Sequence, residues 1–497
     1  MTKESESEGA TPTGVLTALE AGMVIPFGGR HWVRVDEGLA RAFRPGDRLL
    51  VLQTDGTLIH VTAAVAACVE ESVTRAREAF GAMRHIDQSK VTDFYRLFAE
   101  RLRDESVFAR IARANEADVS EARSKGRAVG RLMIDEKMRQ SMIEGLELWR
   151  HTDSVVGASL EHVDHSGWYV DVVRAPLGVV AFVFEGRPNV FADATGVLRG
   201  GNSTVMRIGS DALGTARAIM ELAVRPSLAD AGLPSGAVEL IDEADRSGGH
   251  ALFSDSRVSL AVARGSGPAV AQLGAVARQS GVPVSLHGTG GAWMIVCADA
   301  PDGRVRDCVS ASLDKKVCNT VNVIVLVGHE DRILREVLGG VIEAARGRDA
   351  PATVHLLGDS ARSKISLVPG EVDVRPGEIV ESSTEWEWDD SPEVSIVMVD
   401  EVDEAIDLFN DYSPRFIVSA LTGSEAKRRA IVDRCDAPFV GDGFTRWVDG
   451  QYALRRPELG LSNWQEGRLF ARGGILSGDA VYSVRYHAST PDATQRR

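Results

Sequence analysis

The chain lacks features that mark several classes of protein. No apolar run in its 497 residues approaches the roughly 20 residues that a helix needs to span a bilayer. Its start is acidic and polar, unlike a secretory signal, so we expect a cytoplasmic protein. The five cysteines are odd in number and scattered, and none form a C-x-x-C pair. This favours reduced thiols over a disulfide framework or a zinc site.

Positive charge is also in short supply. The 56 Lys and Arg residues stand against 71 Asp and Glu, which gives a formal net charge of −15. Such an excess of acid opposes nonspecific binding to nucleic acid or to an anionic membrane. An anionic substrate must then be held by a local group of basic residues or by backbone donors. The 44% hydrophobic and 26% charged residues are typical of a globular protein.

The length and the changing apolar pattern predict several structural units. Residues 1–62 read as a polar tail and a small β unit, and from residue 63 a three-to-four spacing predicts helices. From about residue 172, short apolar runs alternate with helix-length segments. These candidate strands lie at 179–184, 204–208, 237–241, 258–263 and 282–286. Because parallel strands need crossover connections of this length, the pattern predicts a doubly wound α/β sheet.

A second α/β unit follows, with candidate strands at 293–297, 321–327 and 394–399. Between them, residues 346–393 are rich in proline, glycine and charge, and are predicted to form long surface loops. The acidic run that bears two tryptophans, residues 385–390, lies near the end of this stretch. We interpret it as a solvated loop rather than as part of a site.

Cys318 is the most informative single residue. It lies in Lys315-Lys316-Val317-Cys318-Asn319-Thr320, which runs directly into the apolar stretch 321–327. Nearby positive charge lowers a thiol pKa from its usual value of about 8.5, so more of the nucleophilic thiolate is present near neutral pH. Taken alone, the segment favours a buried structural cysteine, because free cysteine is among the most buried residue types.

Two strand-to-helix turns lie where ligands bind in open α/β sheets. In the first, Asn189 can direct its side-chain amide at a developing oxyanion, or it can merely cap the next helix. In the second, Arg264-Gly265-Ser266-Gly267 follows a strand and opens a helix, as a phosphate-binding loop does. Arg207 ends another candidate strand and could face a nucleotide ribose or its phosphate, although a surface arginine is the commoner outcome.

Eight segments in order carry a resemblance that no single motif carries. They are Ala175-Pro176-Leu177-Gly178-Val179-Val180, Glu185-Gly186-Arg187-Pro188-Asn189-Val190, Gly201-Asn202-Ser203, Leu233-Pro234-Ser235-Gly236-Ala237-Val238, Arg264-Gly265-Ser266-Gly267, Val317-Cys318-Asn319-Thr320-Val321, Thr445-Arg446-Trp447-Val448-Asp449-Gly450 and Ala471-Arg472-Gly473. The series resembles the gamma-glutamyl phosphate reductase (glutamate-5-semialdehyde dehydrogenase) family, a branch of the aldehyde dehydrogenase superfamily. The similarity spans roughly residues 64–487.

The resemblance implies an aldehyde-dehydrogenase-like fold of two doubly wound α/β domains. It places an NADPH-binding domain at residues 63–292 together with 418–470, and a catalytic domain that carries Cys318 at 293–417. It also implies a hairpin at 154–174 that pairs with a C-terminal strand within 475–487. These two elements would serve oligomerisation, so we expect a homo-oligomer.

The implied reaction is the NADPH-dependent reduction of an amino-acid acyl phosphate to a semialdehyde, as in proline biosynthesis, with an acid kinase as a candidate supplier of the substrate. Cys318 would attack the acyl carbon, while Asn189 and the Cys318 backbone N–H would hold the oxyanion. No metal is needed. The substrate-side residues implied are Arg187, His287, Thr445 and Arg446.

The cofactor residues implied are Arg207, Ser210, Arg264, Gly265, Ser266 and Gly267. Ser210 leaves no acidic side chain at its position to repel a ribose 2′-phosphate, which favours NADPH. Asp211, one residue further on, leaves NADH open.

The chain departs from the family pattern on the substrate side, at Thr289, Ala292, Trp293, 311–316, 442–444 and 453–456. The reaction type is therefore better supported than the identity of the acyl group. Two alternatives remain. A hydrolytic aldehyde dehydrogenase is disfavoured because no glutamate base lies near His287, and a catalytically silent homologue that serves as a binding subunit is disfavoured by the intact Cys318 and Asn189.

Overall fold

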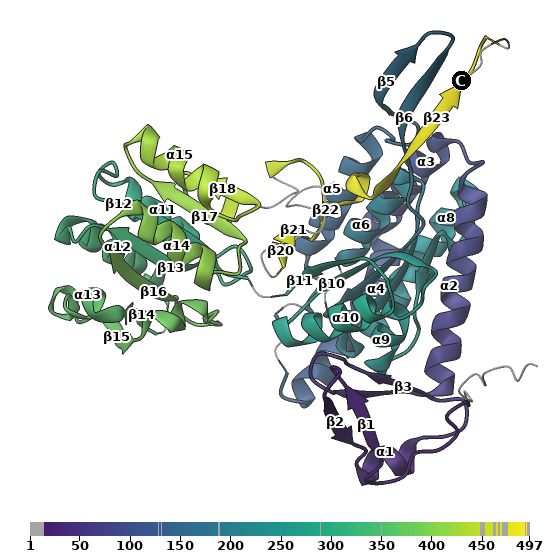
Figure 1. Cartoon of the computed structure of the whole chain (residues 1–497), viewed down its shortest axis with the longest axis horizontal. Coiled ribbons are helices and arrows are strands. Elements are labelled where there is room, and N and C mark those ends of the chain that lie inside the picture. Colours follow the sequence, from purple (N-terminus) through teal and green to yellow (C-terminus); the bar gives the residue numbers. More distant parts are fainter. Residues whose placement is uncertain are drawn as a thin grey trace, which may run out of the picture.

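The protein folds into two bodies that lie side by side (Figure 1). The computed structural model describes residues 14–127, 129–130, 132–186, 189–288, 290–348, 350–447, 453–460, 464–465, 468–469, 476–492 and 494. One body is built on a five-stranded sheet and the other on a seven-stranded sheet. No helix in these ranges is both long and apolar enough to cross a membrane.

The small N-terminal β unit forms as the sequence predicts. Its elements are β1 (Val24–Phe27), β2 (His31–Arg34), α1 (Glu37–Ala42), β3 (Arg48–Val51) and β4 (Leu58–Val61). β1 pairs antiparallel with β2, and β3 pairs antiparallel with β4. Two buried side chains, Leu52 and Val61, join the core of the larger body, so the unit packs against one end of that body rather than hanging free.

Four helices follow: α2 (Ala63–Met83), α3 (Gln88–Arg103), α4 (Glu105–Ser124) and α5 (Glu136–His151). Each begins where a Thr or Asp side chain accepts a backbone N–H of the first turn, which satisfies a donor that the helix cannot. On α3, aromatic and aliphatic residues at three-to-four spacing are fully buried. This face packs against α5 and α8 (Arg225–Ala231).

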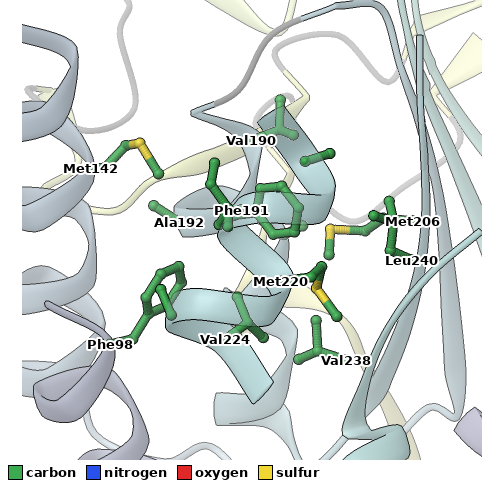
Figure 2. Close-up of a cluster of buried hydrophobic side chains, with 14 of the residues drawn as sticks. Phe98, Met142, Val190, Phe191, Ala192, Met206, Met220, Val224, Val238 and Leu240 are labelled. Carbon is green, nitrogen blue, oxygen red and sulfur yellow. The ribbon is translucent and has the colours of Figure 1, made fainter. Parts of the chain in front are cut away.

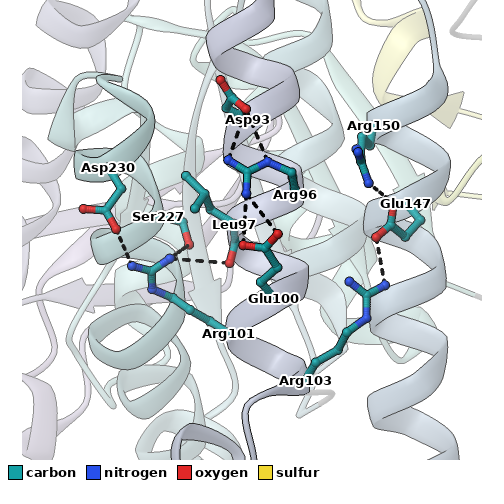
Figure 3. A network of polar contacts seen from close by, with 10 residues as sticks. All are labelled: Asp93, Arg96, Leu97, Glu100, Arg101, Arg103, Glu147, Arg150, Ser227 and Asp230. Atoms are coloured by element: carbon teal, nitrogen blue, oxygen red, sulfur yellow. Dashed lines mark hydrogen bonds and ion pairs between the residues drawn. The ribbon is translucent and has the colours of Figure 1, made fainter.

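The exposed edges of these helices are joined by ion pairs (Figure 3). Arg101 reaches Asp230 on α8 at 2.5 Å, and Arg103 reaches Glu147 on α5 at 2.8 Å. Because the carboxylates are largely or partly exposed, each pair contributes at most about 1 kcal/mol to the stability of the fold.

The five-stranded sheet is entirely parallel, with strand order β11-β10-β7-β8-β9. Its strands are β7 (Val179–Phe184), β8 (Ser203–Ile208), β9 (Val238–Leu240), β10 (Val258–Arg264) and β11 (Val284–His287). The chain moves outward from β7 to β9 and then returns to the other side of β7 with β10. The carboxyl ends of β7 and β10 therefore flank the switch point where ligands bind in sheets of this kind.

Helices cover both faces of this sheet, as a doubly wound fold requires. They are α6 (Val190–Ala194), η1 (Thr195–Gly200), η2 (Ser210–Ala212), α7 (Leu213–Ile219), η3 (Met220–Val224), α8, η4 (Ser235–Ala237), α9 (Ser247–Phe253) and α10 (Gly267–Gln279). Figure 2 shows the core on the α6 side, where Phe191 lies among Met206, Met220 and Val224. This packing anchors α6, and α6 begins directly after Asn189.

The seven-stranded sheet has the order β15-β14-β16-β13-β12-β17-β18 and is parallel throughout. Its strands are β12 (Ala292–Cys297), β13 (Val321–Val327), β14 (Ala352–Leu357), β15 (Val372–Gly377), β16 (Glu393–Val399), β17 (Ile417–Leu421) and β18 (Phe439–Gly441). The helical elements are α11 (Arg304–Ser312), α12 (Asp331–Ala345), α13 (Gly358–Arg362), η5 (Ile365–Leu367), η6 (Ile379–Ser383), α14 (Val402–Tyr412), α15 (Glu425–Arg434) and η7 (Thr445–Trp447). α11 and α12 cover one face, and α14 and α15 cover the other.

Two predictions about this region are wrong. Residues 346–393 are not long surface loops, because they supply β14, which pairs parallel with β16, and β15, which pairs parallel with β14. The chain also does not return to the nucleotide-binding domain at residue 418, because β17 pairs with β12 and β18 pairs with β17. The unit that is predicted to be the catalytic domain therefore extends at least to residue 441.

A three-stranded antiparallel sheet projects from the larger body (Figure 1). It consists of β5 (Ser159–His165), β6 (Trp168–Pro176) and the C-terminal β23 (Tyr482–Ser489), with β6 in the centre. The pairing of the hairpin with a C-terminal strand is as the resemblance implies. Shorter elements precede β23 in the chain: β19 (Glu458–Gly460), β20 (Trp464–Gln465), β21 (Arg468–Leu469), β22 (Leu476–Ser477) and η8 (Gly478–Ala480).

Candidate active site

Cys318 lies in a tight turn that leads into β13. The Thr320 hydroxyl accepts the Val317 N–H at 2.9 Å and donates to the Lys315 carbonyl at 2.6 Å, so one side chain ties both ends of the turn. The Cys318 carbonyl accepts the Gly291 N–H at 2.9 Å. The backbone around the sulfur is therefore fixed from its own turn and from the segment that enters β12.

The segment that enters β12 approaches the Cys318 backbone so closely that its residue 290 must be glycine. A Cβ atom on Gly290 would lie 2.7 Å from the Cys318 Cα and 2.8 Å from its carbonyl oxygen, closer than real Cβ contacts allow. The Cys318 side chain is half-buried against Ala292, Phe416, Ile417 and Phe439. A thiol in this position is held firmly and remains partly accessible.

The other cysteines are poorer candidates for a nucleophile. Cys297, Cys308 and Cys435 are buried, and burial raises the pKa of each thiol, in the case of Cys435 to about 12. Cys68 is half-buried on α2, and burial raises its pKa as well. All five are free thiols, as predicted.

The predicted basic setting of Cys318 is only partly correct. Lys315 is exposed, but the Lys316 side chain is only 6% exposed and its ammonium lies 2.7 Å from the Glu385 Oε1. Glu385 belongs to the run that we predicted to be a solvated loop. That prediction is wrong for half of the run, because Trp388 is 9% exposed and the Trp386 ring stacks on His355 at 3.7 Å. Glu387, Asp389 and Asp390 do face solvent.

Thr445 and Arg446 contact the nucleophile turn rather than an open space. The fully buried Thr445 hydroxyl donates to the Asn319 carbonyl at 2.7 Å, and its backbone N–H donates to the Ser312 hydroxyl. Arg446 donates to the Asp314 carboxylate at 2.7 Å and also to the Asn319 side-chain oxygen. The structure thus brings both predicted residues beside Cys318, and their binding of substrate remains a prediction.

Asn189 begins α6 without capping it. It has helical backbone angles, its side chain makes no capping hydrogen bond, and its buried Oδ1 has no hydrogen-bond partner among the described residues. The alternative interpretation, a structural helix cap, is therefore wrong. A buried Oδ1 that has no partner among the described residues, in an amide held after the carboxyl end of β7, fits a role toward a ligand.

The remaining substrate-side candidates divide. His287 ends β11, is 7% exposed, and makes an edge-on contact with Phe416 across to the catalytic body, at 5.7 Å between ring centroids. Arg187 lies outside the described residues, as does Thr289. Phe416 also belongs to the apolar cluster against which Cys318 packs. His287 therefore contacts the same cluster as Cys318, from the side of the five-stranded sheet.

A cavity of about 380 Å³ lies at the switch point of the five-stranded sheet. Of the six predicted cofactor residues, five line it: Arg207, Ser210, Arg264, Gly265 and Ser266. Gly267 is not in the lining and is the first residue of α10. The cavity floor is formed by the carboxyl ends of β7, β8 and β10, as the sheet topology leads one to expect.

The charges in this cavity are mostly positive. Arg207 is only 7% exposed, its Nη2 donates to the Ala244 carbonyl at 3.1 Å, and its Nε has no partner among the described residues. Burial, and then the neighbouring Arg246, lower the pKa of Arg207. The acidic Asp211 is paired with Arg127, so its charge is already matched. An anion in the cavity would stabilise the charged form of the buried Arg207, which burial and Arg246 disfavour.

Sequence reasoning missed three cavity residues, Arg127, Arg246 and His250. Arg127 follows α4, far from the sheet in sequence, and no local pattern marks it. Arg246 directly precedes α9 and His250 lies within it, in a segment that has no motif of its own. Burial lowers the pKa of His250, which favours the neutral imidazole in the lining of the cavity.

Comparison with known proteins gives a consistent result. A family model described as "Aldehyde dehydrogenase family" matches residues 51–346. A gamma-glutamyl phosphate reductase of Erythrobacter litoralis is 28% identical over 373 residues, which are 73% of this chain and 82% of the relative. The crystal structure of a gamma-glutamyl phosphate reductase from Thermotoga maritima matches with a TM-score of 0.73 and 25% identity, over 86% of this chain and 100% of that one. An acetylating aldehyde dehydrogenase from Geobacillus thermoglucosidasius shares the fold, with a TM-score of 0.62 and 14% identity, over 87% and 99% of the two chains.

Proposed function

Because this chain belongs to the aldehyde dehydrogenase family, we propose that it reduces an amino-acid acyl phosphate to the semialdehyde, with release of phosphate, through a thioester on Cys318. L-glutamyl 5-phosphate or a close relative is the proposed substrate, in proline biosynthesis or a related pathway. The relatives named gamma-glutamyl phosphate reductase support this substrate class. The observation that carries the proposal is the half-buried Cys318 thiol in a turn that its own Thr320 and the Gly291 N–H hold in place.

In the first step the Cys318 thiolate attacks the acyl carbon, and a C–S bond forms. The negative charge moves to the acyl oxygen, which the Asn189 amide and the Cys318 backbone N–H would hold. Collapse of this intermediate breaks the C–O bond to phosphate and leaves a thioester. Reduction of the thioester gives a thiohemiacetal, which expels the thiolate and releases the aldehyde.

The geometry favours this route over hydrolysis of the thioester. Hydrolysis needs a base to activate water, and the described residues of the 286–291 segment include no carboxylate. Glu385 reaches this segment from another element, but its Oε1 accepts from Lys316 at 2.7 Å and its Oε2 from the Gly290 N–H at 2.8 Å. A carboxylate that is committed to two buried donors is a poor general base.

The position of the cavity at the switch point and its arginine-rich lining suit nicotinamide adenine dinucleotide phosphate. Such a cofactor, when bound, supplies the hydride for the reduction. Arg207 would meet an anionic group of the cofactor, because its buried Nε has no other partner among the described residues. In the loop that opens α10, the Gly265 N–H donates to the His287 carbonyl at 3.1 Å and the Ser266 N–H donates to the Glu185 carboxylate, so a phosphate at this helix start would have to displace Glu185. Since Arg127 already matches the charge of Asp211, we favour NADPH over NADH.

We also propose that the chain forms a homo-oligomer through the projecting sheet. β23 and β5 are its edge strands, and each exposes a large apolar side chain, Tyr486 at 72% and Leu160 at 44%. Unpaired edges of this kind pair readily with another chain. An acid kinase that supplies the acyl phosphate is the proposed metabolic partner.

The test is NADP⁺ reduction by the purified protein with glutamate semialdehyde, with and without phosphate. We expect phosphate-dependent turnover that Cys318→Ala abolishes. Cys68→Ala is the matched control, because Cys68 is also half-buried but lies on α2, and it should keep full activity. Turnover that is independent of phosphate would contradict the proposal in favour of hydrolysis, and turnover that survives Cys318→Ala would exclude the nucleophile.

A further inference from the structure

A buried ion pair lies directly beside the nucleophile turn. Lys316 precedes Cys318 by two residues, and its ammonium meets the Glu385 carboxylate at 2.7 Å. The same carboxylate accepts the Gly290 N–H at 2.8 Å. A Cβ on Gly290 would lie 2.9 Å from the Glu385 Oε1 and 2.7 Å from the Cys318 Cα, so the carboxylate and the cysteine backbone flank the same small residue.

The segment that carries Glu385 is clamped on both sides. The Asn322 side chain donates to the Thr384 carbonyl at 2.8 Å and accepts the Trp386 N–H at 2.9 Å. The Trp386 indole then donates to the Ser395 hydroxyl on β16 at 2.8 Å. Glu385 is therefore not a surface residue that happens to reach Lys316. The sheet itself holds it toward the Cys318 turn.

The pair leaves the region beside the thiol close to electrically balanced. Other charged or titratable groups also surround the turn from neighbouring elements: Asp314 and Lys315 on its own segment, Glu387 beyond Lys316, Arg446 on η7 and His287 on β11. Asp314 and Arg446 pair with each other, and Glu387 is 65% exposed, so solvent screens it. Arg446, at 16% exposure, is matched by Asp314, so Lys316 and Glu385, at 6% and 18% exposure, are the other weakly screened charges beside Cys318.

We infer that Lys316 and Glu385 are positioning residues for Cys318, which hold its turn against Gly290 and balance the charge that sets its ionisation. This inference rests on the proposed role of Cys318 as the nucleophile. Each partner alone would then move the thiol in an opposite direction. An unpaired Lys316 ammonium stabilises the thiolate, whereas an unpaired Glu385 carboxylate destabilises it. A purely structural pair would not produce shifts of opposite sign.

The test is the pH profile of alkylation at Cys318, followed by peptide mass spectrometry after iodoacetamide treatment. It needs no substrate, so it can fail or succeed apart from the proposed reaction. Glu385→Gln should move the midpoint to lower pH by about one pH unit, and Lys316→Met should move it to higher pH by about as much. The double variant should return close to the native midpoint. Glu387→Gln, which also removes a carboxylate near Lys316 but at 3.8 Å and in solvent, is the matched control and should shift it little.

Removing one partner leaves a buried charge unpaired, so a single variant can fail to fold. Glu385→Asp then replaces Glu385→Gln, because a shorter carboxylate draws the charge away from Lys316 and should give a smaller shift of the same sign. Turnover of the folded variants should show a lower kcat with little change in the KM for the nicotinamide cofactor, because the pair lies outside that cavity. Shifts of the same sign in both single variants, or no shift in folded variants, would overturn the inference.

Discussion

Replacing Asn189 with alanine should remove activity and leave stability almost unchanged. Loss of one oxyanion donor typically lowers kcat by about 100- to 1,000-fold. The cost to the fold should be small, because the side chain caps nothing and its buried Oδ1 has no hydrogen-bond partner among the described residues. A buried acceptor without a partner costs about 1–3 kcal/mol, so its removal offsets the contacts that the side chain loses. We expect a change in the free energy of unfolding of about 1 kcal/mol or less.

Asn202→Ala is the matched control for this prediction. Asn202 is fully buried, and its Oδ1 accepts the N–H groups of Leu177 and Gly178 at 2.7 and 3.0 Å. Its amide donates to the Val197 and Val481 carbonyls. The substitution leaves these two buried N–H groups without an acceptor, at about 1–3 kcal/mol each, so we expect the free energy of unfolding to fall by several kcal/mol.

The assay pairs initial rates at saturating substrate with urea unfolding of both variants. The expected result is an inactive, stable Asn189→Ala protein and a destabilised Asn202→Ala protein. Native activity in Asn189→Ala would refute the oxyanion role. A loss of stability equal to that of Asn202→Ala would show that Asn189 is a structural residue after all.

Three other predictions follow from the same geometry. Arg207→Met should weaken binding of NADPH by about 10- to 100-fold in calorimetric titration, because a charge-assisted contact is lost, and should weaken NADH less; equal losses for the two cofactors would contradict the charge argument. Between pH 7 and 9, alkylation should label Cys318 and spare Cys435. Burial raises the pKa of Cys435 to about 12, so this thiol stays protonated throughout that pH range. Rapid labelling of Cys435 in the folded protein would contradict its burial. Tyr486→Glu should reduce the assembly to smaller species in light scattering while the far-UV circular dichroism is kept, because a charge on the exposed edge strand opposes pairing; an unchanged mass would place the oligomer interface elsewhere.

The sequence predicts those parts of the fold that local pattern determines. The strands β7, β8, β12, β13 and β16 are fully or almost fully buried, β10 is buried at four of its seven positions, and all six show as largely apolar runs. β15 could not be found in this way, because Val372–Gly377 alternates buried with exposed positions and contains a proline. It lies at the edge of the sheet, where one side of a strand needs no partner.

The site divides in the same way. Cys318, Asn189 and the loop at 264–267 stand in motifs that are local in sequence. Glu385 reaches the Cys318 turn only because the clamp at Asn322 and the pairing of β16 with β13 bring a distant segment to it. Its acidic surroundings made a solvated loop the natural interpretation. Arg127 likewise enters the cavity through tertiary packing that no spacing in the sequence records.

The thioester on Cys318 can be detected in the intact mass of the enzyme after reaction with semialdehyde and NADP⁺ in the absence of phosphate. We expect that one acyl group accumulates per chain, that peptide mapping finds it on Cys318, and that added phosphate removes it. An enzyme that turns over without any acyl adduct on Cys318, or whose adduct phosphate does not release, would contradict the thioester route.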